Sequence, residues 1–142
     1  GDGSERTALQ AQAARLGIGD SVRLLGWRDD VHDLHAAFDL FTLASRSEGT
    51  SISLLEAMSA GLCPVVTDVG GNREVLGSEL GELLSPSEDP AALAAAWERV
   101  LAEPARRKAL AQVAQTRARD QYDVSQMVAS YERLYQGAGR LR

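Results

Sequence analysis

The stretch LFTLASRSEGTSISLLEAMSAGLCPVVT, residues 40–67, decides the fold. It opens with the almost wholly apolar run 40–44 and closes with a second apolar run, 64–67, and both runs are typical of strands covered on both faces of a parallel sheet. Between them, a glycine-containing loop leads into a helical pattern that ends near Ala60. The stretch therefore predicts a parallel βαβ unit, with the right-handed crossover that such units adopt.

The same alternation of strand and helix continues on both sides of this unit. Upstream, we predict a helix with Ser4 as its N-cap and Gly17 as its stop, a short strand over 22–26, and a short helix between 31 and 38. Downstream, we predict, in order, a strand over 64–67, a tight turn over 68–71, a helix from Asn72, a weaker strand over 82–84, and helices from Pro90, from Pro104 and over 125–135. The pattern predicts one domain over residues 1–142 of class α/β, a Rossmann-like parallel sheet with helices on both faces.

Composition narrows the function classes. The chain has 142 residues, of which 44% are hydrophobic, and this suffices for the core of one domain. The formal net charge of -5 argues against a nucleic-acid partner, because a phosphate-binding face needs a surplus of lysine and arginine. The single cysteine cannot form an internal disulfide, and no stretch reaches the roughly 20 apolar residues that span a bilayer. Without a recognisable secretion signal, we expect a cytoplasmic protein.

The loop and helix after residue 44 carry the chemistry. Two carboxylates, Glu48 and Glu56, lie eight positions apart, and a glycine and small hydroxyl residues stand between them. The first amides of a helix are unpaired donors that carry partial positive charge. A phosphate facing residues 49–53 would therefore be held without any basic side chain, which suits an acidic protein with an anionic ligand.

These residues resemble a known enzyme family. The spacing of Glu48 and Glu56 matches the E-x7-E signature of family-4-type retaining glycosyltransferases, within the run SEGTSISLLEAMSAGLCPVV. Residues 24–26 (LLG), 39–41 (DLF) and 68–74 (DVGGNRE) resemble neighbouring elements of the same family, the last being its Gly-Gly-x-x-Glu turn. The chain is thus similar to the C-terminal, donor-binding domain of a GT-B glycosyltransferase of group 1. The resemblance is strong over residues 1–76 and holds only in pattern beyond them.

The resemblance implies that this chain is truncated at its N-terminus. In the family, two further strands come before the position of Gly1 in the sequence. In the sheet, these two strands lie between the strand at Val22 and the strand at Leu40. The first connection between strand and helix supplies the Arg and Lys that clamp the diphosphate. The acceptor-binding N-terminal domain, onto which the C-terminal helices cross back, would be a missing partner. We therefore expect the isolated chain to be inactive.

The resemblance also assigns roles to individual residues. Glu48 would contact hydroxyls of the donor sugar and is the catalytic candidate, and Glu56 would bind the ribose. The donor-binding set is completed by the diphosphate-facing loop, by two residues near the base and by a glycine turn that approaches the sugar or phosphate: Gly49, Thr50, Ser51, Ile52, Ser53, Trp27, Arg28, Gly70 and Gly71. No metal and no cofactor are implied, because the departing phosphate itself helps to deprotonate the acceptor.

Many relatives carry Phe-Gly where this chain has Thr50-Ser51. A diphosphate held by backbone amides would tolerate that change.

The expected function is retaining transfer of a hexosyl group from a nucleotide-diphosphate sugar, in polysaccharide or glycolipid biosynthesis. One alternative is a non-catalytic nucleotide-sugar-binding or interaction module, and another is a nucleotide-sugar epimerase with the GT-B fold. The basic cluster 106–108 is most simply a solvated helix face, and peripheral membrane association of the parent enzyme stays open.

Several residues also have plainer explanations. Ser53 and Glu56 fit a capping box, Glu48 fits an ordinary loop acid, and the glycines at 70–71 fit a simple turn. Two histidines, His32 and His35, are three positions apart near several aspartates, but no third metal ligand follows at a recognised spacing, so we expect a solvated polar face. Cys63 opens a buried strand, where it would fill space in the core.

Overall fold

The computed structural model describes residues 2–138, which belong to two compact units with the bounds Gly1–Leu34 and His35–Arg142. The single domain expected over residues 1–142 stays a prediction. The first unit contains helix α1 (Arg6–Arg15), the 3-10 turn η1 (Gly19–Ser21) and most of helix α2 (Val31–His35).

The predicted N-cap of α1 is wrong, and its predicted stop is confirmed. The residue before the helix is Glu5, whose side chain makes no capping hydrogen bond, and the Ser4 hydroxyl donates to the Glu5 carboxylate instead. At the other end, Gly17 has a φ of 70°, the left-handed conformation in which glycine ends a helix.

The predicted strand over 22–26 does not form. Val22 is extended, but within residues 2–138 no strand pairs with it, and a strand without a ladder partner leaves its backbone groups unpaired. Side chains provide hydrogen-bond partners for some backbone groups of this segment, and of Trp27 just after it, instead. The Arg6 guanidinium donates to the Leu24 carbonyl at 2.7 Å, and the amide of Trp27 donates to the Asp2 carboxylate at 3.0 Å.

The second unit is built on a parallel sheet. Its strands are β1 (Leu40–Leu43), β2 (Cys63–Thr67) and β3 (Leu84–Ser85), in the order β1-β2-β3. Leu40 pairs with Cys63, and Val66 pairs with Leu84. The apolar runs at 40–44 and 64–67 are therefore confirmed as neighbouring parallel strands.

The strand predicted over 82–84 begins later than expected. Residues Ser78–Leu83 form the 3-10 helix η2, which buries Leu80 and Leu83. Side chains three positions apart lie on the same face of a 3-10 helix, so this spacing brings both leucines into the core. The sequence pattern was ambiguous because a short apolar run fits a buried helical turn as well as a strand.

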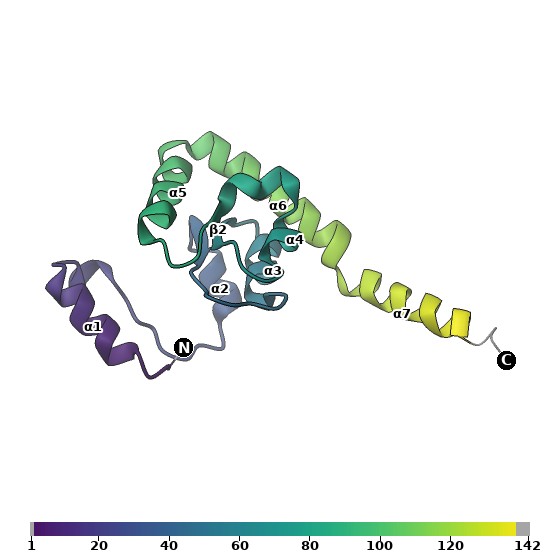
Figure 1. Cartoon of the computed structure of the whole chain (residues 1–142), viewed down its shortest axis with the longest axis horizontal. Helices are drawn as coiled ribbons and strands as arrows, with labels where there is room; N and C mark the ends of the chain where they lie inside the picture. The colour runs from purple at the N-terminus through teal and green to yellow at the C-terminus, as the bar shows by residue number, and fades with distance from the viewer. Residues whose placement is uncertain (1, 139–142) are drawn as a thin grey trace. The chain divides into compact units, whose positions relative to one another are not determined.

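Five helices complete the second unit: α3 (Ile52–Ser59), α4 (Asn72–Leu76), α5 (Pro90–Ala102), α6 (Pro104–Tyr122) and α7 (Val124–Ala138), as Figure 1 shows. The start of α5 is the one predicted, because the Asp89 carboxylate accepts a hydrogen bond from the Ala92 amide at 2.9 Å and Pro90 takes the first helical position.

Helices cover both faces of the sheet, as predicted. Strand β2 is buried at each of its five residues. On β1, successive side chains point to opposite faces. Phe41 makes an edge contact with His35 at the end of α2, whereas the Thr42 hydroxyl accepts a hydrogen bond from Trp97 of α5 at 3.1 Å.

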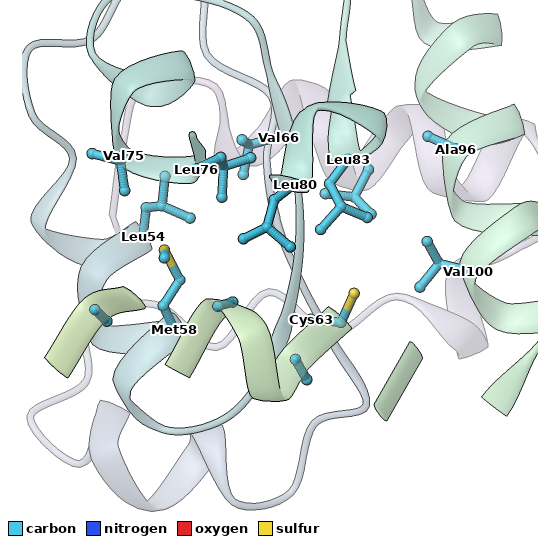
Figure 2. Packing of buried hydrophobic residues seen from close by; sticks show 14 residues of the cluster. Leu54, Met58, Cys63, Val66, Val75, Leu76, Leu80, Leu83, Ala96 and Val100 are labelled. Carbon is cyan, nitrogen blue, oxygen red and sulfur yellow. The ribbon is translucent and has the colours of Figure 1, made fainter. Parts of the chain in front are cut away.

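The core lies between β2 and the surrounding helices. In Figure 2, Leu54 and Met58 of α3 lie beside Val75 and Leu76 of α4, and Ala96 and Val100 of α5 point toward Leu83. Cys63 belongs to the same cluster and is buried, so its predicted space-filling role is confirmed.

Helix α7 differs from the core helices because its apolar residues are exposed. They are Val124, Met127, Val128, Tyr131, Leu134 and Tyr135. Across residues 2–138, no helix is both long enough and apolar enough to cross a bilayer.

The turn after β2 packs against the loop after β1. Gly70 has a φ of 51°, and a Cβ atom there would stand 1.8 Å from the Glu48 carbonyl oxygen. The amide of Gly71 donates to the Gly49 carbonyl at 3.0 Å, and a Cβ at Gly71 would lie 2.7 Å from the same oxygen. Glycine is therefore required at both positions so that the two backbones can approach.

We expect Gly70→Ala to lower the free energy of unfolding by about 1–3 kcal/mol, because the new methyl group meets backbone and the left-handed conformation is costly for alanine. Urea denaturation of the variant measures this change. Gly81→Ala is the matched control, since a Cβ at Gly81 meets no atom within 4 Å. Equal stability of the two variants would contradict the packing that we describe.

The single cysteine reports on the core. Burial raises the pKa of the Cys63 thiol to about 11, because the thiolate loses hydration inside the protein. At pH 8 we therefore expect Ellman's reagent to modify native protein about a hundredfold more slowly than protein unfolded in guanidinium, with the native rate rising as the pH approaches 11. Rapid modification of folded protein at pH 8 would show that the thiol is accessible, and Cys63→Ala gives the background rate.

Candidate functional site

The candidate site lies where β1 and β2 end. Because the strands are parallel and adjacent, the loop that leaves β1 and the turn that leaves β2 emerge at the same edge of the sheet, where open α/β sheets bind ligands. The loop from β1 ends at Ser51, the N-cap of α3, whose hydroxyl accepts a hydrogen bond from the Leu54 amide at 3.3 Å. This cap fixes where the helix begins and which amides remain unpaired.

A row of free amides lies at this helix start. In the part of the chain that the structure describes, the backbone N–H groups of residues 49–53 donate no hydrogen bond. Ile52 is 64% exposed, and Gly49, Thr50 and Ser53 are exposed as well. Only Ser51 is buried. Unpaired amides at the positive end of a helix dipole, on a segment whose residues are exposed except at Ser51, are suited to binding an anion.

Glu48 lies on the loop just before these amides. It is partly buried, and its carboxylate oxygen Oε1 accepts a hydrogen bond from the Ser45 hydroxyl at 2.6 Å. Among residues 2–138, no other side-chain or backbone donor reaches this carboxylate. One oxygen of Glu48 is therefore held by the protein and the other is free to accept a hydrogen bond from a ligand.

Glu56 lies on the exposed side of α3. The helix buries Leu54, Ala57 and Met58, whereas Glu56 is exposed, as are Ile52 and Ser53 one turn earlier. The alternative capping-box role for Glu56 does not fit, because the helix begins after Ser51 and Glu56 lies in the second turn. Glu56 is thus an exposed carboxylate, one helical turn after the free amides, that does not cap the helix.

The structure adds anchors that the sequence analysis did not identify. The Thr67 hydroxyl, at the end of β2, donates to the Ser45 carbonyl at 2.7 Å, and the Ser87 hydroxyl reaches the same oxygen at 3.3 Å. The Asn72 side chain donates to the Thr67 carbonyl at 2.9 Å. A Ser-x-x-Glu spacing at 45–48 is a local signal for the Ser45–Glu48 contact, whereas the longer-range bonds leave no mark in the sequence.

The predicted glycine turn meets the loop of Glu48 directly. Gly70 and Gly71 contact the backbone of Glu48 and Gly49, and this packing alone accounts for glycine at both positions. Their approach to a sugar or phosphate stays a prediction.

The two predicted base-binding residues belong to the first unit. Trp27 is 81% exposed, and Arg28 forms a hydrogen-bonded ion pair with Asp30, with 2.6 Å between Nε and Oδ1. The hydrogen bond from Arg28 holds the pKa of the Asp30 carboxyl below its ordinary value. Because the placement of Trp27 and Arg28 beside a base involves both units, it stays a prediction.

Arg46 of the loop and two residues of the basic cluster 106–108 form ion pairs with carboxylates. Arg46 forms an exposed ion pair with Glu88 at 3.0 Å and does not pair with Glu48. In the cluster 106–108, Arg106 pairs with Glu82 and Arg107 with Asp39. These pairs offset most of the cluster's charge, so the helix face offers less attraction to an anionic surface than the sequence suggests.

The prediction of a solvated face for both histidines is wrong for His35. Its side chain is only 4% exposed and makes edge contacts with Phe38 and Phe41 at centroid distances of 6.4 Å. It is the last residue of α2 and packs under β1, which the three-residue spacing to His32 did not reveal. Throughout residues 2–138, no three His, Cys, Asp or Glu side chains gather as metal ligands would.

Known proteins resemble this chain in sequence. Residues 1–117 match the family described as "Glycosyl transferases group 1". A D-inositol 3-phosphate glycosyltransferase of Salinispora tropica is 38% identical over 84% of the chain, which spans 26% of that protein. An N-acetyl-alpha-D-glucosaminyl L-malate synthase of Bacillus anthracis is 30% identical over 95% of the chain, which spans 35% of it.

Solved structures agree with the fold. A sucrose-phosphate synthase from Thermosynechococcus elongatus superposes over the whole chain with a TM-score of 0.87 at 25% identity, and the chain covers 36% of it. HepE of Anabaena, in complex with UDP, superposes over 95% of the chain with a TM-score of 0.83 at 26% identity, and again 36% of that protein is covered. The fold, the site at the strand ends and the match over residues 1–117 agree: the chain belongs to the group 1 glycosyltransferases, as a C-terminal domain of the GT-B fold.

Proposed function

We propose that this chain binds a nucleotide-diphosphate sugar and that the complete protein transfers the hexosyl group to an acceptor with retention of configuration. The observation that carries the proposal is the row of unpaired amides at residues 49–53, placed between the acids Glu48 and Glu56. The amides can donate hydrogen bonds to a diphosphate, and the two acids can accept hydrogen bonds from hydroxyl groups. A nucleotide-diphosphate sugar has both, with sugar hydroxyls at one end of the diphosphate and ribose hydroxyls at the other.

The two acids divide the ligand between them in this proposal. Glu48 precedes the amide row and has one free carboxylate oxygen, which accepts hydrogen bonds from hydroxyls of the donor sugar. Glu56 follows one helical turn later and accepts hydrogen bonds from the ribose. The relatives support a nucleotide-sugar ligand in general: HepE is described in complex with UDP, and also with UDP and glucose.

The chemistry proposed for the site is electrostatic. As the bond between the anomeric carbon and the phosphate oxygen breaks, negative charge grows on the departing diphosphate, and the unpaired amides of residues 49–53 stabilise that charge by donating hydrogen bonds to it. The acceptor hydroxyl oxygen forms the new bond on the same face, and its proton passes to the departing phosphate oxygen. No carboxylate nucleophile and no metal ion are needed for this step.

Calorimetric titration of the complete protein with UDP, GDP and ADP tests the ribose role of Glu56. We expect one nucleotide to bind and Glu56→Gln to weaken it by about tenfold, because a charge-assisted hydrogen bond contributes roughly 1.5–3 kcal/mol. The 2′-deoxy form of that nucleotide should bind wild type more weakly and should bind the variant with little further loss.

Glu98→Gln is the matched control, since Glu98 is an exposed glutamate on α5, away from the loop. If Glu56→Gln bound the nucleotide as tightly as this control does, Glu56 would be removed from the site. If wild type bound none of the three nucleotides, the proposal itself would be wrong.

A further inference from the structure

We propose that Ser45 is a positioning residue, which fixes the carboxylate of Glu48 for the donor sugar and is itself held in place by Thr67. The inference rests on the proposed function, because it gives Glu48 a sugar to bind. It assigns work to two hydroxyl groups that touch neither the amide row nor the ligand in that proposal.

The first step is the contact between Ser45 and Glu48. The Ser45 hydroxyl donates to Oε1 of Glu48 at 2.6 Å, a short bond of the kind that a hydroxyl makes to an ionised carboxylate. It orients the carboxylate plane and leaves the second oxygen free. Without it, Glu48 would be a loop glutamate able to rotate about its side-chain bonds, and binding a sugar would first have to order it.

The second step is that Ser45 cannot move freely. Its carbonyl accepts a hydrogen bond from Thr67 at 2.7 Å, and a longer one from Ser87 at 3.3 Å. These donors come from the end of β2 and from the segment after β3, so two segments that leave neighbouring strands bind a single carbonyl. A loop residue that is hydrogen-bonded in this way is held in position almost as firmly as the sheet itself.

The third step is that Thr67 is the rigid end of the chain of contacts. Its side chain is 3% exposed, and its hydroxyl also approaches the Leu43 carbonyl at 3.3 Å. The shorter distance to Ser45 marks that bond as the principal one. Because the carbonyl of Thr67 is bound by the buried Asn72 side chain, the residue is fixed from both sides.

The test compares affinities for sugar-carrying and sugar-free nucleotides in the complete protein. UDP-glucose with UDP, GDP-mannose with GDP, and ADP-glucose with ADP are titrated calorimetrically to find the pair that wild type binds. For that pair, we expect Ser45→Ala and Thr67→Val to weaken the nucleotide sugar by about tenfold relative to its diphosphate, whose affinity should change by less than about twofold. Loss of structure alone would weaken both ligands together.

Two comparisons locate the effect. Thr67→Ser keeps the hydroxyl and should restore the wild-type ratio of affinities. Thr42→Val is the matched control, since Thr42 donates to the Val65 carbonyl at 2.7 Å from the neighbouring strand without contacting the loop, and it should leave the ratio unchanged. In a Glu48→Gln background, Ser45→Ala should cause no further loss, because Ser45 acts through Glu48.

The outcomes separate the two proposals. If wild type binds a pair and neither variant changes the ratio, or if the losses at Ser45 and Glu48 simply add, the positioning role is overturned and the proposed function stands. If wild type binds no nucleotide, the proposed function is overturned together with this inference.

Discussion

The site depends on one close contact between two backbones, in which the amide of Gly71 donates to the carbonyl of Gly49. The contact requires that Gly70 and Gly71 have no Cβ, since an added carbon would stand 1.8 Å from the Glu48 carbonyl oxygen or 2.7 Å from that of Gly49. It joins the turn after β2 to the loop after β1. The parallel register of the strands places those two segments at the same edge of the sheet. The glycines then allow their backbones to come close enough to form a hydrogen bond.

This hydrogen bond between the turn and the loop matters because, in the proposed site, the loop contacts a ligand mainly through its backbone amides. The protein has a formal net charge of -5, and the guanidinium group of Arg46 on this loop is paired with the Glu88 carboxylate. In the proposed site, an anion is therefore held by the amides of residues 49–53, whose dipoles stabilise it only if they keep their direction. The Ser51 cap sets the first turn of α3, and the glycine contact holds the loop that precedes it. An acidic chain can thus offer an anion-binding surface without a surplus of basic side chains.

Much of the fold could be predicted because it follows from local patterns. The apolar runs that became β1 and β2, and the Asp89 cap of α5, each depend on residues adjacent in sequence. The failures concern segments whose conformation depends on distant partners. Residues 22–26 are apolar enough for a strand but have no strand beside them among residues 2–138, and His35 is buried by aromatic neighbours that its helical spacing to His32 does not encode.

The candidate site shows the same division between local and distant information. The spacing of Glu48 and Glu56 and the hydroxyls before α3 can be read from one short segment, so the sequence identifies the acids and the amide row together. Thr67 bonds to Ser45 across 22 positions of sequence, and only the pairing of β1 with β2 brings them together. Ser45 therefore connects the two kinds of information. Its hydroxyl donates a hydrogen bond to Glu48, three residues later, while its carbonyl accepts one from Thr67 on the neighbouring strand. The position of the Glu48 carboxylate therefore depends on the pairing of the strands.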